Sequence, residues 1–290
     1  MTSWDEIRTA FQVARLGTVS AAAEALGVHH ATVIRHVDAL ESRLGVRLFQ
    51  RHARGYTPTE AGQELLRVAA RADDGFSQLA ARIKGQEATG ELVVTALPSL
   101  VPRLVPVLTE FQDRNPGLSV RLLAAERLFR LESGEAHIAI RAGLEPPAQP
   151  DNVVQALART RFRLVAAESY LARHGRPAGE GDLPAHRFVG LDGDGGRAPF
   201  NRWIEALAPG RIAFRTGGDP AMLEAIAGGA GIGFASVQDS AERGGLVEIL
   251  PARPDWEVPL WLVTHVDLHR SPKVQAALAS LKERAKGWTG

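Results

Sequence analysis

Five polar residues in one short stretch of the chain carry side chains that can bind the edges of DNA bases. Val33 and Val37 stand four residues apart and form the buried stripe of a predicted helix, so the polar residues around them face outward. Arginine can bind guanine through two parallel hydrogen bonds, and threonine and histidine offer further donors and acceptors. The pattern predicts a surface for the DNA major groove, made of His29, His30, Thr32, Arg35 and His36.

A helix-turn-helix would position this surface. Ala23 is small enough for two helices to cross closely, and Gly27 can adopt the positive φ of a helix-ending turn. Ser20 can cap the helix before the turn and joins the predicted DNA-binding set. The third helix is expected over residues 29–44. The alternative is an ordinary corner of two helices with a solvated polar face.

A short hairpin with arginines is expected next, over residues 50–57, with residues 45–49 leading into it. Between His29 and Gly55 there are five arginines and two acidic residues, although the net charge of the chain is only +1. Arg51 and Arg54 are expected to contact the DNA backbone or minor groove and to add affinity that falls with salt; the alternative for both is solvated surface. Residues 1–58 therefore predict a winged helix-turn-helix domain.

Residues 59–90 predict a long linker helix with a heptad-like apolar seam. We expect this helix to pair with a second copy of the chain, because no apolar helix precedes it to cover the seam. The alternative is packing on its own domain. The residues predicted at the interface between copies are Leu65, Ala72, Phe76, Leu79 and Ile83.

Residues 91–290 alternate between strands and helices, which indicates an α/β domain. The number of strands favours two subdomains, with subdomain I at about 91–160 and 266–290 and subdomain II at about 161–265. Separate strands are expected at Val153–Leu157 and Phe162–Ala167. A short helix is expected between the strands Leu118–Ala124 and His137–Ile140.

A small-molecule site is expected where strands end and helices begin in this domain. Arg141 ends a strand, and its planar guanidinium could bind a carboxylate; the alternative for it is a surface ion pair. We therefore expect a small anionic effector, bound by residues after the first strand, at the end of another strand and at the start of a facing helix: Pro98, Ser99, Leu100, Arg141, Gly218 and Asp219.

Enzymatic signatures are missing from the sequence. The glycines of residues 229–233 follow a predicted helix and open a strand, which reverses the order of a dinucleotide-binding fingerprint. Ser99 lacks a Gly-x-Ser-x-Gly elbow, and the histidines have no cysteine or carboxylate at metal-ligand spacing. We expect no enzyme activity, no metal and no cofactor.

No apolar run of about 18 residues and no signal peptide are present, which indicates no membrane partner and a cytoplasmic location.

The N-terminal segments resemble the LysR-type transcriptional regulators in residue types and spacing. The specific matches lie at residues 20–28, 33–41, 44–51 and 59–62, and looser ones at 111–116, 134–141, 170–175 and 227–233. The resemblance implies a multidomain protein: an α-rich winged helix-turn-helix, a linker helix that dimerises, and an α/β two-subdomain effector domain like the periplasmic binding proteins. It further implies double-stranded DNA as partner, a homodimer or homotetramer, a small molecule bound between the subdomains, and RNA polymerase as a partner if the protein is an activator.

Two departures from the family pattern limit what the resemblance implies. The recognition helix opens with His29, His30 and Ala31 where the family commonly has Ser-Gln-Pro, so no DNA preference is carried over. Ser236 stands where proline is common.

The competing hypothesis is a cytoplasmic solute-binding receptor formed by the C-terminal domain, with the helical segment serving only assembly. Residues 1–62 favour the regulator, because a solute receptor needs no winged helix.

Overall fold

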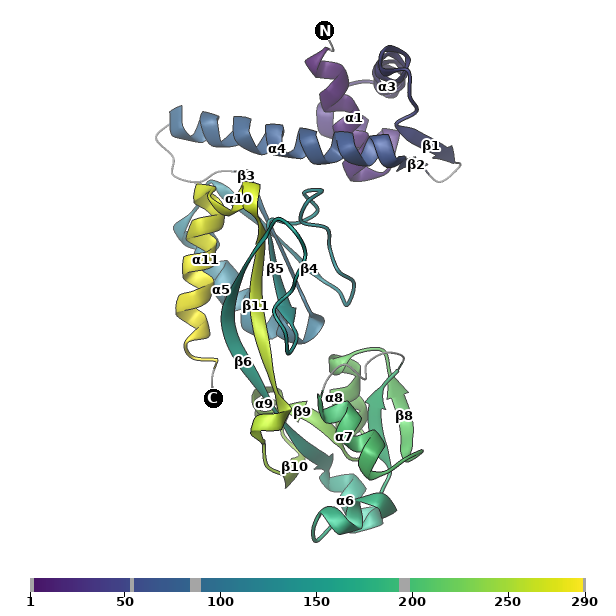
Figure 1. The fold of residues 1–290 in the computed structure, drawn as a ribbon, viewed down its shortest axis with the longest axis vertical. Helices are drawn as coiled ribbons and strands as arrows, with labels where there is room; N and C mark the ends of the chain where they lie inside the picture. Colours follow the sequence, from purple (N-terminus) through teal and green to yellow (C-terminus); the bar gives the residue numbers. More distant parts are fainter. Residues whose placement is uncertain (1–2, 53–54, 84–89, 193–198, 289–290) are drawn as a thin grey trace.

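The computed structural model describes residues 3–52, 55–83, 90–192 and 199–288. Figure 1 shows an elongated molecule in which an N-terminal helical domain, a central α/β subdomain and a second α/β subdomain follow one another along the long axis. None of the helices in the described residues is both long and apolar enough to cross a membrane.

The N-terminal domain is a winged helix-turn-helix, as predicted. Val33, Val37 and Leu40 are fully buried on one side of the third helix, together with Ala10 and Val13 of the first. Gly27 takes the left-handed conformation, with φ of 64°, and ends the second helix. The elements are α1 (Trp4–Leu16), α2 (Val19–Leu26), α3 (His30–Leu44) and an antiparallel hairpin of β1 (Phe49–His52) and β2 (Gly55–Pro58).

The cap of α2 is Thr18 rather than Ser20. Thr18 Oγ1 accepts a hydrogen bond of 3.2 Å from the backbone N–H of Ala21, and Ser20 lies inside the helix. The prediction that Ser20 caps α2 was wrong, because both residues can cap a helix and only the extended backbone of Thr18 selects between them.

The linker helix α4 (Glu60–Ile83) packs on its own domain over part of its length. Leu65 packs against the core of the N-terminal domain, and the ring of Phe76 lies 5.3 Å from the ring of Trp4 in an edge-on contact. Helix α1 therefore covers part of the seam, and the expectation that no helix does so was wrong. Ala72 is half-buried, whereas the side chains of Leu79 and Ile83 lie outside the described residues.

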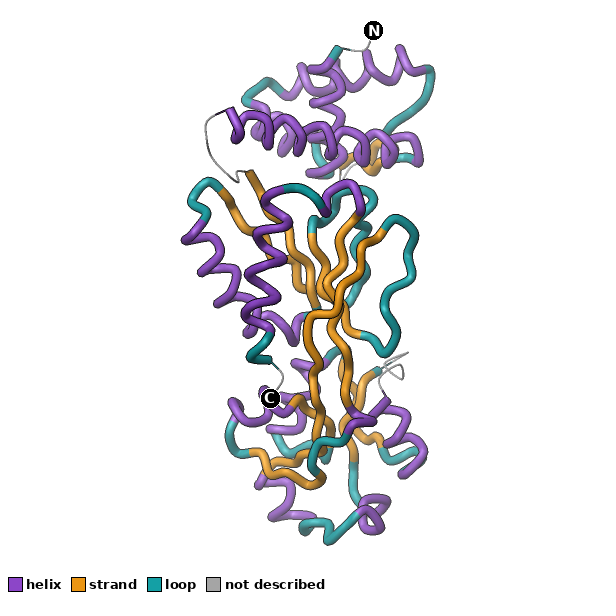
Figure 2. Tube along the Cα trace, turned by 60° about the vertical axis from the view of Figure 1, so that its left-hand side comes forward, coloured by secondary structure: helices purple, strands orange, loops and turns teal. Residues whose placement is uncertain are grey.

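The central subdomain is built on a mixed sheet. β3 (Gly90–Ala96) pairs in parallel with β4 (Leu118–Ala124) and β5 (Ile138–Ala142), and β11 (Glu257–His265) pairs antiparallel with β5. Helices α5 (Val101–Arg114) and α11 (Pro272–Ala285) bury one apolar face of this sheet, and Figure 2 shows them side by side against the strands. A turn of 3-10 helix, η1 (Pro98–Leu100), joins β3 to α5, and α10 (Val266–His269) follows β11.

A continuous strand, β6 (Asn152–Ala167), runs through both subdomains. It pairs with β11 in the central subdomain and with β9 (Gly233–Ser236) and β10 (Leu246–Leu250) in the second. The prediction of two separate strands in this segment was wrong. Arg159 and Arg161 interrupt the apolar run, but they alternate with the buried Thr160, as in a strand with one exposed face.

The course of β6 and β11 also changes the subdomain bounds. The predicted boundary at residue 160 falls inside β6, and Leu260–Val263 of β11 pair with β5 in the central subdomain instead of lying in subdomain II. These two long strands are the covalent link between the subdomains (Figure 1).

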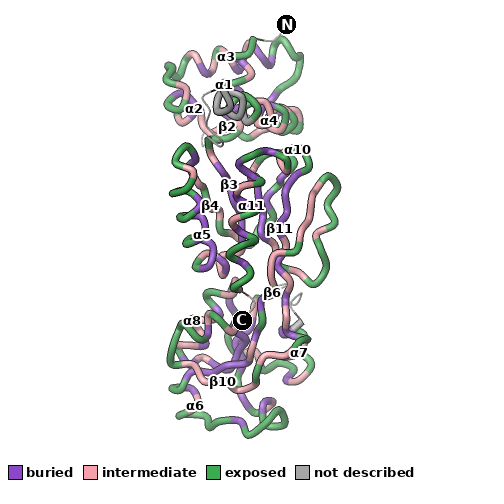
Figure 3. Tube along the Cα trace, turned by 90° about the vertical axis from the view of Figure 1, so that its left-hand side faces the viewer, coloured by how far each residue is buried: buried purple, intermediate pink, exposed green. Residues whose placement is uncertain are grey.

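The second subdomain surrounds an aromatic core. Its strands β7 (Phe188–Leu191) and β8 (Ile212–Thr216) pair in parallel. Its strand β9 (Gly233–Ser236) is buried, whereas β8 is largely exposed, and Figure 3 shows buried and exposed segments mixed along the helices. The helices are α6 (Glu168–His174), η2 (Glu180–Ala185), α7 (Pro199–Leu207), α8 (Asp219–Ala227), α9 (Val237–Arg243) and η4 (Pro254–Trp256).

The short helix predicted between β4 and β5 is not formed. Residues 125–137, all described, are irregular, and Leu131 and Ala136 pack instead against Val93 and Val263 of the sheet. The prediction was wrong because these apolar residues cover the sheet from an irregular loop and need no helical face.

Candidate DNA-reading surface and effector cavity

The structure places the predicted DNA-reading residues along α3 and at its start. His29, His30 and Arg35 are exposed, and Thr32 is half-buried, on the helix whose opposite side buries Val33 and Val37. His29 occupies the cap position without a side-chain hydrogen bond to the helix. Ser20 is exposed on the neighbouring helix α2.

His36 has a partner inside the domain. Its Nδ1 lies 3.0 Å from Thr9 Oγ1, and the Thr9 hydroxyl donates to the carbonyl oxygen of Asp5 at 2.6 Å. Because the hydroxyl has one proton, His36 Nδ1 is the donor to Thr9. His36 therefore ties α3 to α1, which limits its freedom to turn toward DNA.

Glu41 joins the recognition helix to the wing and was missed by sequence reasoning. Its side chain is 3% exposed and accepts hydrogen bonds from Arg47 at 2.7 Å, from the N–H groups of Leu48 and Phe49 at 2.8 and 3.1 Å, and from Arg51 at 3.0 Å. Burial alone would raise the pKa of Glu41, but these hydrogen bonds and the charge of Arg51 outweigh it and hold the pKa below its usual value.

Arg51 is held by two acidic residues of α3. It donates to Asp38 at 2.5 Å and to Glu41, and its guanidinium lies 5.2 Å from the ring of Tyr56. The hydrogen bond that Arg51 donates to Asp38 is the main reason that the pKa of Arg51 is raised. Arg51 therefore helps to fix the wing to α3. Arg54 lies outside the described residues.

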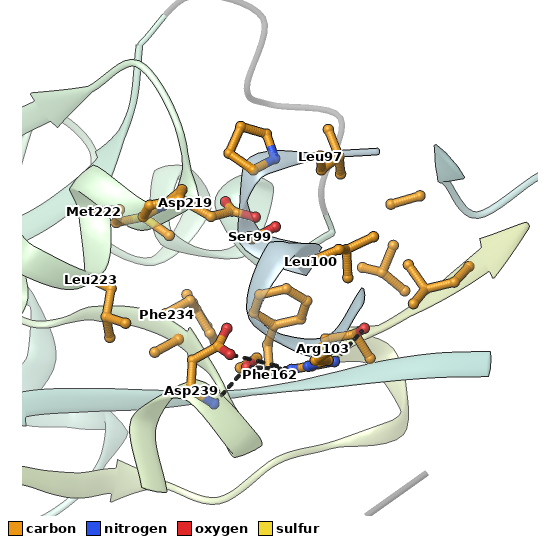
Figure 4. Close-up of a pocket in the computed structure, with 18 of the residues that line it drawn as sticks. Leu97, Ser99, Leu100, Arg103, Phe162, Asp219, Met222, Leu223, Phe234 and Asp239 are labelled. Atoms are coloured by element: carbon orange, nitrogen blue, oxygen red, sulfur yellow. Dashed lines mark hydrogen bonds and ion pairs between the residues drawn. The ribbon is translucent and has the colours of Figure 1, made fainter. Parts of the chain in front are cut away.

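A cavity of about 540 Å³ lies between the two subdomains. Ser99 and Leu100 of η1 border it from the central subdomain, and Asp219 of α8 and Phe234 of β9 border it from the second. In Figure 4 the Ser99 hydroxyl and the Asp219 carboxyl point toward each other. Of the predicted effector residues, Pro98, Ser99, Leu100 and Asp219 line this cavity.

Arg141 does not line the cavity. Its Nη1 donates to Gln149 Oε1 at 2.7 Å and its Nη2 to the carbonyl oxygen of Phe129 at 3.2 Å. The guanidinium of Arg141 is held by neighbouring loops outside this cavity, so its binding of a ligand carboxylate stays a prediction. Gly218 caps α8 but is also absent from the cavity lining.

Arg103 is the buried arginine of the cavity, and it links the two subdomains. From α5 it donates to Ser236 Oγ at 3.0 Å and lies 3.5 Å from both Asp239 Oδ1 and Thr160 Oγ1. Its Nε has no hydrogen-bond partner among the described atoms. The sequence signal was available: Arg103 stands four residues before Val107 and eight before Phe111, on the apolar face of its helix.

Acidic residues are among those that line the cavity. Burial, then the charges of Glu126 and Asp239, raise the pKa of Asp219 to about 6, although a hydrogen bond from Ser99 lowers it in part. Burial also raises the pKa of Glu126. Both carboxyls are therefore easier to protonate than they would be in water.

Comparison with known families covers both parts of the chain. Residues 4–63 match the family described as "Bacterial regulatory helix-turn-helix protein, lysR family", and residues 85–286 match the "LysR substrate binding domain". The chain belongs to the LysR family of transcriptional regulators.

Individual relatives agree with this assignment. The chain is 32% identical over 217 residues to the transcriptional regulator CrgA of Neisseria meningitidis serogroup C, covering 72% of this chain and 69% of CrgA. A solved structure of CrgA from Neisseria meningitidis has a TM-score of 0.60 at 26% identity and covers 98% of this chain and 99% of that one. The same fold occurs in CbnR, solved with its target DNA, with a TM-score of 0.63 at 22% identity, 98% of this chain and 99% of that one.

Family membership decides between the hypotheses raised by the sequence. The protein is a LysR-type transcriptional regulator with a helix-turn-helix DNA-binding domain and an effector-binding domain, and its relatives are regulators, not enzymes. The alternative of a solute receptor leaves residues 4–63 without a role.

Proposed function

We propose that this regulator reads DNA mainly through α3 and uses the cavity between its subdomains to sense a small molecule. The observation that supports the first part is the exposed face of α3, opposite the fully buried Val33 and Val37. Thr32 and Arg35 contact bases, His29 and His30 contact phosphates or bases at the start of the helix, and Ser20, Arg51 and Arg54 add contacts at the edges.

Replacing Arg35 by alanine is expected to weaken specific DNA binding by about 10- to 100-fold, since a bidentate arginine–guanine contact contributes about 1–3 kcal/mol. Fluorescence anisotropy on a genomic fragment selected by the wild-type protein measures the change. Arg114→Ala is the matched control, because it removes an exposed arginine of α5 in the effector domain. Equal affinities of the Arg35 and Arg114 variants would remove Arg35 from the interface.

The effector is proposed to bind between Ser99 on one subdomain and Asp219 on the other, so that binding changes the angle between subdomains joined by β6 and β11. The volume of about 540 Å³ is within the range of small-molecule sites. The expectation of an anionic effector drew on helix starts and on Arg141, and Arg141 donates instead to Gln149 and to the Phe129 carbonyl oxygen. The protein is proposed to act in the cytoplasm, and to contact RNA polymerase if it activates transcription.

The regulator is proposed to assemble at least as a dimer through α4. Val68 and Phe76 remain 53% and 57% exposed on this helix after α1 has packed against it, which leaves apolar surface for a second copy. Two copies would place two α3 helices on one face of the duplex, so the binding site should be an imperfect palindrome.

Light scattering at micromolar concentration is expected to give at least twice the chain mass of 31.2 kDa, and four times that mass if the dimers pair. Replacing both Val68 and Phe76 by serine should shift the mass downward. A single-chain mass for the wild-type protein would contradict the proposed assembly.

A further inference from the structure

We infer that the cavity between the subdomains takes a small organic cation, an amine on an aromatic or aliphatic body, whose ammonium group lies between Asp219 and Glu126. This inference rests on the proposed function of the cavity as the effector site, and it names the chemical class of that effector.

Two carboxyls from opposite subdomains meet at this cavity. Asp219 is the first residue of α8 in the second subdomain, and Glu126 follows β4 in the central one. Both line the cavity. A Cβ atom placed on Gly218 would lie only 2.9 Å from Oε1 of Glu126, so the Glu126 carboxyl reaches across to the start of α8.

The cations that line the cavity are already neutralised by other acids. Arg103 lies 3.5 Å from Asp239, and Arg243 forms an ion pair of 2.8 Å with Glu224. In the part of the chain that the structure describes, neither Glu126 nor Asp219 forms an ion pair with a basic residue. The cavity therefore presents two negative groups without a counter-charge.

The electrostatic cost of this arrangement favours a cationic ligand over an anionic one. Desolvation raises the pKa of Glu126, and desolvation together with the charges of Glu126 and Asp239 raises the pKa of Asp219, so the charged form of each carboxyl is unfavourable. An ammonium group within about 4 Å of both would remove that cost, whereas a ligand carboxylate would add a third negative charge.

The rest of the cavity fits an apolar body with an oxygen atom. The ring of Phe200 lies 4.4 Å from that of Phe162 and 5.0 Å from that of Phe234, which gives the cavity an aromatic wall. Arg103 also lines the cavity and is 7% exposed, so its guanidinium adds a buried hydrogen-bond donor to the otherwise apolar wall.

A matched series of three compounds tests the inference on the full-length protein. Tyramine, tyrosol and 3-(4-hydroxyphenyl)propionate share a phenol and differ in carrying an ammonium, a hydroxyl or a carboxylate. At pH 7.5 we expect calorimetry to show the tightest binding for tyramine, and thermal unfolding to show the largest stabilisation by it.

Charge-removing variants show whether the carboxyls carry the binding. Asp219→Asn and Glu126→Gln keep the side-chain shape, and each should weaken tyramine binding at least 10-fold, whereas Asp113→Asn, an exposed position outside the cavity, should leave it unchanged. Tighter binding of the carboxylate, undetectable tyramine binding at 10 mM, or unaltered tyramine binding in both charge variants would overturn the inference.

Ser99→Trp, which fills the cavity, separates this outcome from failure of the proposed function. If the carboxylate or the alcohol binds best and Ser99→Trp abolishes that binding, the cavity is the effector site and the amine class alone is wrong. If Ser99→Trp leaves the binding of every compound unchanged, the cavity is not their site and both proposals fail.

Discussion

Replacing Glu41 by alanine is expected to lower the free energy of unfolding of the N-terminal domain by about 3–5 kcal/mol. The carboxylate is 3% exposed and accepts four hydrogen bonds that join α3 to the wing. Its loss leaves two backbone N–H groups without their acceptor, takes the ion-pair partner from Arg47 and removes one of the two acids that hold Arg51. Each unsatisfied buried group costs about 1–3 kcal/mol.

The loss should be visible in urea denaturation followed by circular dichroism, with Glu24→Ala as the control because Glu24 is exposed on α2. The pKa of Glu41 is lowered in the folded protein. Its contribution to stability is therefore complete above the usual carboxyl pKa of 4.5 and is lost as the pH falls through the lowered value. Identical unfolding of the two variants would show that the hydrogen bonds of Glu41 contribute little.

Replacing Asp219 by asparagine is expected to stabilise the unliganded effector domain by about 1–3 kcal/mol at pH 7.5. In the folded protein the pKa of Asp219 is raised from 3.8 to about 6 by burial and by Glu126 and Asp239, so the charged form costs free energy at neutral pH. Asparagine keeps the shape of the side chain and a hydrogen-bonding group for Ser99 without that charge.

The sign of the pH dependence follows from the raised pKa. Between about pH 6 and pH 3.8 the folded wild-type protein binds the proton more tightly than the unfolded chain, so the cost of Asp219 is complete above pH 6 and disappears below 3.8. The difference in Tm between Asp219→Asn and wild type should be several degrees at pH 7.5 and should shrink toward pH 4.5. Asp113→Asn serves as control. A lower Tm of the Asp219 variant at pH 7.5 would contradict this account.

The N-terminal domain could be predicted from the sequence because its information is local. The spacing of Val33 and Val37 and the glycine at position 27 specify a helix-turn-helix within one stretch of the chain. The residue that caps α2 was predicted wrongly because Thr18 and Ser20 both carry a hydroxyl that can accept the capping hydrogen bond.

The cavity could be predicted only in part, because its walls come from residues far apart in the sequence. Ser99 and Asp219 were found since each follows a strand and begins a helical turn. The direction of Arg141 depends on Gln149 and the Phe129 carbonyl, and no periodicity reveals such partners. The continuous course of β6 depends on pairing with β11, about 100 residues later in the chain.

Selection of genomic DNA fragments by the purified protein tests the central claim most directly. The wild-type regulator and a Thr32→Ala, Arg35→Ala double variant are each incubated with sheared genomic DNA, and the bound fragments are sequenced. We predict a few enriched sites with imperfect palindromic symmetry for the wild type and loss of those sites for the double variant, with its circular dichroism unchanged. Enrichment of the same sites by both proteins would contradict the conclusion that α3 reads the sequence.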